Sequence, residues 1–312
     1  MRDSNSSASA LTLPHDARVI GAGLGFTEGP AALNTGEVGV VSINRGKVYA
    51  VDLQGAGARE IAETGGGPNC LAIGTKGEIW VTQNGATAMA SKSALSQAPS
   101  IQKIDGGVVS TVLHTGVSAP SDCVIGPDGR LWFTDPASHG TGAANTSGAL
   151  RVLDPETSNV STLLEDLQFP NGLCFAREPD HLYVAETVRG VVRRYRFDGA
   201  QCQWDGWEAE VPGGTPDGIA LDSQGWLWVA GGTGDNVVAF DPAGKVRNEL
   251  SFGHGVLVTS VCFAGERLET LVVTVAKGGS VIALPAIHPG QPLPVTRLDE
   301  IDDAAKRCGC HD

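Results

Sequence analysis

The chain lacks the features that mark several classes of protein. It has 22 Lys and Arg against 35 Asp and Glu, a formal net charge of −13, and no run of basic residues. Nucleic acids and anionic membrane surfaces are bound through clustered Lys and Arg, so we expect neither as a partner. No stretch is long and apolar enough to span a bilayer.

Cysteine is scarce and its placement predicts no disulfide framework. The chain has seven Cys, an odd number. Four of them fall early in short apolar stretches: Cys70, Cys123, Cys174 and Cys262. Thiols in such places behave as small buried hydrophobic groups, so we expect a reducing, cytoplasmic location. The Cys308-Gly-Cys310-His311 tail is read either as a soft-metal ligand or as a frayed end with spare thiols.

What the chain does contain is a sixfold repeat. A short polar or acidic residue precedes an apolar stretch at six matching places: Glu28, Asn69, Ser121, Asn171, Asp217 and Thr259. These positions are 41, 52, 50, 46 and 42 residues apart. A four-stranded propeller blade takes about 40–50 residues. The spacing therefore predicts six blades.

Each repeat also carries the same sequence of strands and turns. An apolar strand is followed by a Gly-centred turn and then by a strand with a central aromatic residue: Trp80, Trp132, Tyr183 and Trp228. Strands this short and evenly spaced predict an all-β fold, a six-bladed β-propeller with four antiparallel strands per blade. We expect one propeller domain over residues 17–300, after a disordered or extended lead (1–16) and before a tail (301–312). Either residues 17–21 or residues 295–298 would complete the closing blade.

The six polar residues predict a site in the central channel. The first strand of each propeller blade lines the channel, so side chains at the starts of these strands meet around one axis. Carboxylates gathered without a counter-charge raise each other's pKa, and a bound cation relieves this. The donors are all oxygens, which favours Ca²⁺, Mg²⁺ or Mn²⁺ over Zn²⁺. Two interpretations stay open: the ion is catalytic, or it only holds the blades together. Considered singly, Asn69 and Thr259 are also typical of turns, where such side chains bond to nearby backbone.

Several residues near this channel mouth are candidates for chemistry. Asp217, held between Pro216 and Gly218, is the best candidate for a general base or nucleophile beside a metal ion. His139 and His254 are the histidines best placed to reach a substrate, although a lone loop His is more often a solvated bystander. Asp135 and Glu186 end second strands near the same mouth, or are exposed charges at a blade edge.

Two common active-site motifs are missing. The GAGLG segment at residues 21–25 is followed by no helix pattern, so it does not predict a dinucleotide site. No Ser lies in a G-x-S-x-G nucleophile elbow.

Three motifs, each placed before a strand, resemble the gluconolactonase, senescence-marker-protein and luciferin-regenerating-enzyme family: Glu28-Gly29-Pro30, Pro170-Asn171-Gly172 and Pro216-Asp217-Gly218. The resemblance covers roughly residues 18–285. It implies a six-bladed propeller with one divalent cation in the channel; we expect Ca²⁺, with Mg²⁺, Mn²⁺ or Zn²⁺ as alternatives. It also implies that Glu28, Asn171 and Asp217 are metal ligands, that Asp217 is the base or nucleophile, and that the activity is hydrolysis of lactones or, in some relatives, of organophosphates.

The sequence departs from the family at two places. Many members have Asn-Asp where this chain has Ser121-Asp122, so we expect Ser121 to reach an ion only through water or not at all. Sugar-lactone members also carry Arg and Glu where this chain has Ala119 and His139. The loss of a fixed cation argues against a simple aldonolactone and for a less polar lactone or related cyclic ester. The predicted substrate-binding residues are Asn69, Ser121, Asp122, His139 and His254.

Three functions are compatible with these residues. The first is a metal-dependent hydrolase acting on a small lactone-type ester. The second is a non-catalytic, metal-stabilised propeller that binds a small molecule or a protein. The third is another reaction on the same scaffold, such as phosphotriester hydrolysis or a strictosidine-synthase-like condensation. Fold analogy alone does not choose among them.

Overall fold

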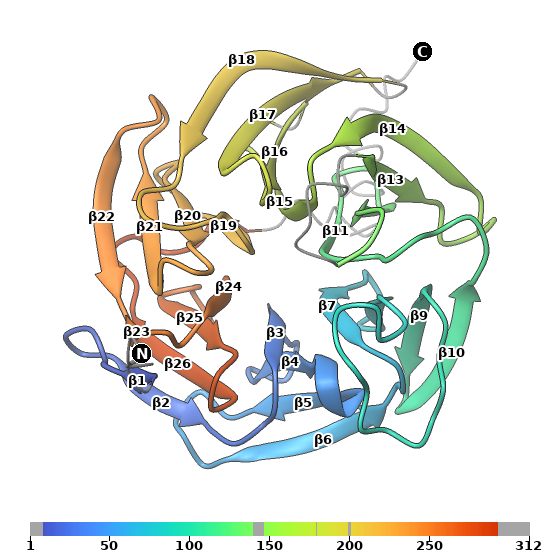
Figure 1. Ribbon diagram of the computed structural model, residues 1–312, viewed down its shortest axis with the longest axis horizontal. Coiled ribbons are helices and arrows are strands. Elements are labelled where there is room, and N and C mark those ends of the chain that lie inside the picture. Colours follow the sequence, from blue (N-terminus) through green and yellow to red (C-terminus); the bar gives the residue numbers. More distant parts are fainter. Residues whose placement is uncertain (1–8, 140–146, 179, 199–200, 293–312) are drawn as a thin grey trace, which may run out of the picture.

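Six four-stranded antiparallel sheets are arranged radially around a central channel in the computed structural model (Figure 1). The structure describes residues 9–139, 147–178, 180–198 and 201–292. Within each of the first five sheets the strands follow one another in sequence, and the first strand of each lies nearest the axis. The predicted all-β, six-bladed propeller is therefore confirmed.

The first three blades have these bounds. Blade 1 consists of β3 (Thr27–Ala32), β4 (Val38–Ser42), β5 (Lys47–Val51) and β6 (Ala58–Glu63), with the 3₁₀ turn η1 (Ile43–Arg45) after β4. Blade 2 consists of β7 (Pro68–Ile73), β8 (Ile79–Gln83), β9 (Ser100–Asp105) and β10 (Val108–Leu113). Blade 3 consists of β11 (Cys123–Ile125), β12 (Leu131–Asp135), β13 (Gly148–Leu153) and β14 (Val160–Leu167).

The last three blades complete the ring. Blade 4 consists of β15 (Pro170–Phe175), β16 (His181–Glu186), β17 (Val191–Phe197) and β18 (Cys202–Glu210). Blade 5 consists of β19 (Ile219–Leu221), β20 (Leu227–Ala230), β21 (Asn236–Phe240) and β22 (Val246–Ser251). Blade 6 consists of β24 (Val258–Ala264), β25 (Thr270–Val275), β26 (Ser280–Pro285) and the N-terminal strand β2 (Arg18–Gly21).

Strand β2 closes the circle. It pairs antiparallel with β26, with Arg18 opposite Ala283, so that the first and last parts of the propeller lie side by side (Figure 1). This decides between the two predicted closing segments, because residues 17–21 are used and residues 295–298 lie outside the described part of the chain. Just before it, β1 (Ala10–Leu11) pairs with β23 (Gly253–His254).

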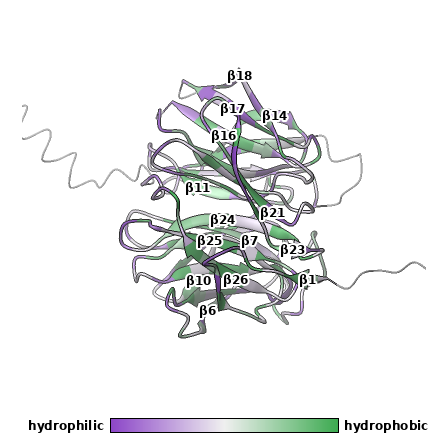
Figure 2. Cartoon of the chain, turned by 90° about the vertical axis from the view of Figure 1, so that its left-hand side faces the viewer, coloured by the Kyte–Doolittle hydropathy of each residue, from purple (hydrophilic) through white to green (hydrophobic). Residues whose placement is uncertain are grey.

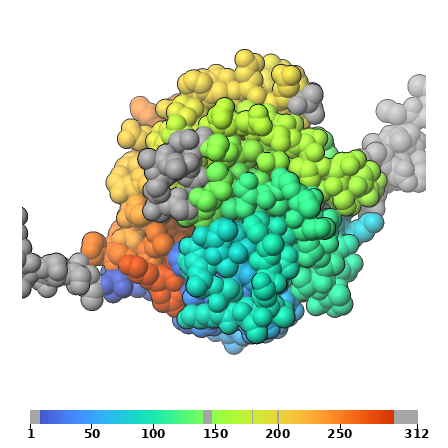
Figure 3. Space-filling view, turned by 45° about the vertical axis from the view of Figure 1, so that its right-hand side comes forward, coloured from blue at the N-terminus to red at the C-terminus, as the bar shows by residue number. Residues whose placement is uncertain are grey.

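Apolar contacts between neighbouring blades form the core. Trp132 is fully buried and meets Phe175 of the next blade edge-to-face, with ring centroids 5.2 Å apart. Its indole N–H donates to Asp128 in the Gly-centred turn, as Trp228 donates to Asp222. The space-filling view shows blades 2, 3 and 4 in direct contact around the ring (Figure 3). The outermost strand β18 is mostly exposed and hydrophilic, as Figure 2 shows.

Candidate metal centre

The repeated polar residues lie at the starts of the inner strands, as predicted. Four of the six are the second residue of an inner strand: Glu28, Asn69, Asn171 and Thr259. The other two, Ser121 and Asp217, lie two residues before the inner strand of their blade. All of them are buried except Asp217, which is half-buried. The inner strands thus bring these side chains to one end of the channel.

Glycines let the inner strands approach each other at this level. A side chain at Gly29 would collide with the backbone of Cys70, and one at Gly172 would collide with the backbone of Asp217. The Gly172 N–H donates to the Asp217 carbonyl at 3.2 Å, and the equivalent Gly218 N–H donates to Thr259 at 2.9 Å. Close approach of neighbouring backbones therefore requires the Gly of the E-G and N-G motifs, and it draws neighbouring blades together around the axis.

Three carboxyl groups gather here and affect one another. Burial raises the pKa of Glu28 well above its usual range, and the charges of Asp217 and Asp122 add to the effect, against a 2.6 Å hydrogen bond from Gly29. Burial and the charge of Asp122 likewise raise the pKa of Asp217, while a hydrogen bond from Asn171 lowers it. Burial raises the pKa of Asp122 to about 7. In the described part of the chain, no basic side chain contributes to these shifts.

The donor set fits a hard divalent cation. The negative charge is uncompensated, all the donors are oxygens, and one carboxylate oxygen of Asp122 is buried without a hydrogen-bond partner. Among the described residues, however, no three His, Cys, Asp or Glu side chains are grouped closely enough to hold an ion by themselves. An ion here would therefore need the Asn171 amide oxygen and water beside the Glu28 and Asp217 carboxylates.

The remaining ring residues are bound to each other or to backbone. Asn69 donates to the Ser121 hydroxyl at 3.1 Å, and Ser121 donates to the Asn171 amide oxygen at 3.3 Å. Thr259 bonds to the Thr27 carbonyl and to Thr274, a structural use of its hydroxyl. The structure thus joins Asn69, Ser121 and Asn171 in one network, and Asp122 acts on its neighbours through charge.

Asp135 and Glu186 hold the loops that precede two of the ring residues. The Asp135 carboxylate accepts from Ser118 and Ala119 N–H and pairs with Arg151 at 2.9 Å. The Glu186 carboxylate accepts from the N–H of residue 168 and pairs with arginines at positions 189 and 193. Both acids are buried. The alternative that they are exposed blade-edge charges is therefore wrong.

The two predicted histidines lie in different environments. His139 is half-buried, donates through Nε2 to the Ala119 carbonyl at 3.1 Å and packs against the Phe169 ring. Burial lowers its pKa to about 4, so it is neutral near pH 7. His254 is exposed, and its backbone pairs with Ala10 of β1. The structure brings His139 to the loops of blades 3 and 4 and leaves His254 outside the ring network.

Two residues that the sequence reasoning missed belong to the network. Asn84 donates to the Asn69 amide oxygen at 2.9 Å, and Thr187 accepts from the Asn171 amide nitrogen at 3.2 Å. Each directly follows the second strand of its blade. This shared repeat position, next to the loop that precedes the ring residue, was the signal that could have identified them.

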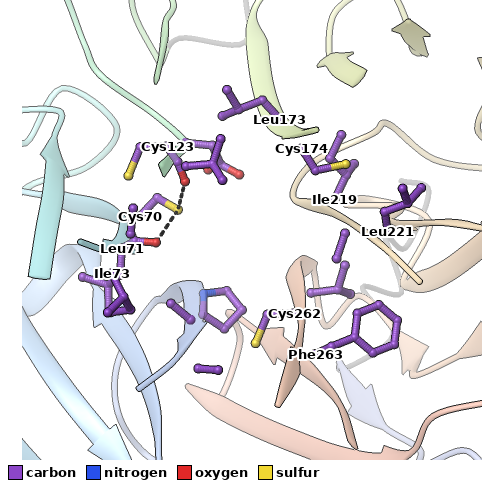
Figure 4. Close-up of a pocket in the computed structure, with 18 of the residues that line it drawn as sticks. Cys70, Leu71, Ile73, Cys123, Leu173, Cys174, Ile219, Leu221, Cys262 and Phe263 are labelled. Carbon is purple, nitrogen blue, oxygen red and sulfur yellow. Dashed lines mark hydrogen bonds between the residues drawn. The ribbon is translucent and has the colours of Figure 1, made fainter. Parts of the chain in front are cut away.

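A cavity of about 600 Å³ occupies the channel below this ring of polar residues (Figure 4). The inner strands and the turns that follow them line it, so it lies on the side away from the loops. Its walls are largely apolar, as Leu71, Leu221 and Phe263 illustrate. Four free cysteines also line it: Cys70, Cys123, Cys174 and Cys262. The first three are buried, and Cys262 is half-buried.

The chain belongs to the family described as SMP-30/Gluconolactonase/LRE-like region, whose sequence profile matches residues 26–277. A pentonolactonase, XacC of Haloferax volcanii, is 32% identical over 162 residues, which are 51% of this chain and 53% of that protein. A gluconolactonase of Zymomonas mobilis is 24% identical over 234 residues, 67% of this chain and 60% of that protein. The chain therefore aligns with only about half to three fifths of these relatives, which are named as lactonases.

Solved structures share the fold. A gluconolactonase from Xanthomonas campestris superposes with a TM-score of 0.70 at 22% identity, covering 89% of this chain and 94% of that one. A calcium-binding regucalcin from Agrobacterium tumefaciens gives 0.71 at 18%, covering 91% and 100%. At these identities the likeness establishes the propeller alone. In the described part of the chain, no helix is long and apolar enough to cross a membrane.

Proposed function

We propose that the protein is a metal-dependent hydrolase that opens a lactone or related cyclic ester. One observation carries the proposal: Glu28, Asp122 and Asp217 act on one another beside the Asn171 amide, and no basic side chain among the described residues contributes there, in a family that includes lactonases. The protein ligands of the ion would be Glu28, Asn171 and Asp217, and the ion that we propose is Ca²⁺. Such an ion supplies electrophilic polarisation of the ester carbonyl and stabilises the ionised carboxylates.

The protein residues would act around that centre as follows. Asp217 is the half-buried acid of the ring, which supports its role as the group that meets the substrate. As a general base it takes a proton from the attacking water and returns it to the ring oxygen when the acyl C–O bond breaks. As a nucleophile its carboxylate would instead attack the ester carbonyl and form a mixed anhydride as the acyl C–O bond breaks, and the released ring oxygen would take a proton from water. Water would then hydrolyse the anhydride and restore the carboxylate. Asn69 and Ser121 would hold the Asn171 amide.

The substrate is proposed to be less polar than an aldonolactone. Both polar backbone groups of Ala119 are hydrogen-bonded, because its N–H donates to Asp135 and its carbonyl accepts from His139. No guanidinium stands there to bind sugar hydroxyls, and His139 is neutral. Two relatives are named pentonolactonase and gluconolactonase, and these names favour sugar lactones as substrates. A panel of substrates distinguishes sugar lactones from less polar lactones. The free thiols of the channel fit a cytoplasmic location, which is part of the same proposal.

A chelation experiment tests the function. The purified protein is treated with a chelator and assayed on γ- and δ-lactones, apolar and hydroxylated, as Ca²⁺, Mn²⁺ and Zn²⁺ are restored separately. We expect turnover to disappear with the metal and to return with Ca²⁺, with apolar lactones preferred. A phosphotriester in the panel tests the organophosphate alternative. Chelation that lowers the melting temperature while no metal restores any turnover would favour a non-catalytic binding protein.

A further inference from the structure

A chain of hydrogen bonds with one direction runs from blade 2 to blade 5. Asn84 Nδ2 donates to Asn69 Oδ1 at 2.9 Å, and Asn69 Nδ2 donates to Ser121 Oγ at 3.1 Å. Ser121 Oγ donates to Asn171 Oδ1 at 3.3 Å, and Asn171 Nδ2 donates to Thr187 Oγ1 at 3.2 Å. Thr187 Oγ1 finally donates to the Pro216 carbonyl at 2.8 Å. Each group donates to the next. The chain ends one residue before Asp217.

The last link fixes the direction of the whole chain. The Pro216 carbonyl can only accept, so the single hydroxyl hydrogen of Thr187 is committed to it. Thr187 Oγ1 must then accept, and only the amide nitrogen of Asn171 can face it. The Asn171 oxygen is consequently turned toward Ser121, whose hydroxyl donates to it.

The opposite direction is also chemically available. With every amide reversed, Asn69 would donate to Asn84, and the Asn84 nitrogen would take the position of its oxygen, which is buried without a partner. Thr187 would donate to Asn171 instead, the Pro216 carbonyl would lose the hydroxyl, and Asp217 would lose the hydrogen bond that it accepts from Asn171. The network therefore has two arrangements, and the bonds to the Pro216 carbonyl and to Asp217 select the observed one.

We propose that Thr187 is a positioning residue that orients the Asn171 amide, so that its oxygen is presented on the Ser121 side of the ring as a ligand. An amide ligates hard cations through its oxygen, so the orientation decides whether Asn171 can serve at all. This inference rests on the proposed function, because it assumes that Asn171 holds the ion. Groups that orient a metal ligand commonly change metal affinity by about 10–100-fold when they are removed.

The test compares three substitutions. Thr187→Val removes the hydroxyl and keeps the shape, and Thr187→Ser keeps the hydroxyl. Thr64→Val is the matched control, because Thr64 is a buried threonine whose hydroxyl donates to the Gly65 carbonyl, outside the chain of hydrogen bonds. Calorimetric titration of chelator-treated protein with Ca²⁺ should show affinity about 10–100-fold weaker in Thr187→Val. Thr187→Ser and Thr64→Val should remain close to wild type, and saturating Ca²⁺ should restore kcat in Thr187→Val.

The outcomes separate this inference from the proposed function. Equal Ca²⁺ affinity in Thr187→Val and wild type would overturn the inference and leave the function standing. If wild type binds no ion, the function fails, and NMR of the ion-free proteins decides the inference. Side-chain N–H contacts of Asn171 should shift from residue 187 in wild type to residue 121 in Thr187→Val, and unchanged contacts would refute it. Thr187→Ala serves if Thr187→Val does not fold.

Discussion

Asp217 differs from the other acids of the ring because it is half-buried, whereas Glu28 and Asp122 are buried. We expect Asp217→Asn to lose about 10²–10⁴-fold in kcat on any lactone that the wild type hydrolyses, because the proton acceptor is gone. The fold should survive, since the substitution also removes a repelling charge from a buried acidic cluster. Rates and melting temperatures of both proteins test this. A fully active Asp217→Asn would remove Asp217 from the mechanism.

Asp122 gives the ion-free protein a pH-dependent stability. Burial raises its pKa from 3.8 to about 7, so between these values the folded protein keeps a proton that the unfolded chain releases. The contribution of Asp122 to the free energy of unfolding is therefore present below pH 3.8 and is lost as the pH rises through about 7. With chelator present, we expect Asp122→Asn to match wild type near pH 4 and to exceed its stability at pH 8.

Melting curves from pH 4 to pH 8 measure that difference directly. Asp105→Asn is the control, because Asp105 is exposed at the end of β9. If the wild-type and Asp122→Asn curves stay parallel across the range, the carboxyl of Asp122 does not carry the proposed proton.

The polar positions of the ring could be predicted from the sequence, but their hydrogen-bond partners could not. Glu28, Asn171 and Asp217 stand out because the repeat places an oxygen ahead of each strand. Asn84 and Thr187 do not stand out, because a single polar residue after a strand is ordinary in a loop. Their roles depend on which amide faces which neighbour, and that is decided by contacts between blades that are far apart in sequence.

At the scale of strands and loops, the ends of the second strands determine how the ring loops are held. Glu186 accepts from the backbone before Asn171 and pairs with Arg189 and Arg193. We expect Glu186→Gln to lower the free energy of unfolding by about 1.5–3 kcal/mol, because a buried charged acceptor is lost. It should also weaken ion binding, since the loop that carries Asn171 loses its anchor.

Glu208→Gln is the matched control, because Glu208 pairs with the same Arg193 from a partly exposed position on β18. Exposed ion pairs contribute about 0–1 kcal/mol, so denaturant titration should show a small change. Equal effects of the two substitutions would mean that Glu186 is no more than a surface charge. The sequence placed Glu186 at the correct strand end, but its burial depends on how blade 4 packs against its own loop.

At the scale of the whole molecule, the number of blades followed from the repeat, whereas the closing strand did not. Residues 17–21 and 295–298 are both short segments that contain two or more apolar residues and one Arg, so composition could not choose between them. The structure uses β2, whose first two residues are exposed and whose last two are buried. Ile20 is 3% exposed and lies in the apolar cluster between blades 6 and 1, whereas Val19 is 40% exposed.

Closure of the ring and the candidate metal centre should therefore be coupled. Blade 6 meets blade 1 through Thr259, whose hydroxyl binds the Thr27 carbonyl next to Glu28. We expect Ile20→Asp to lower the free energy of unfolding by more than about 3 kcal/mol, because a carboxylate would be buried without a partner at this junction. The control Val19→Asp should change the free energy of unfolding by no more than about 0.5 kcal/mol. Because Glu28 stands on the first blade and Asn171 and Asp217 on the fourth and fifth, a loosened junction should also weaken Ca²⁺ binding, measured by calorimetry. Unchanged Ca²⁺ affinity in a destabilised Ile20→Asp would show that the ring residues hold their places without the closing strand.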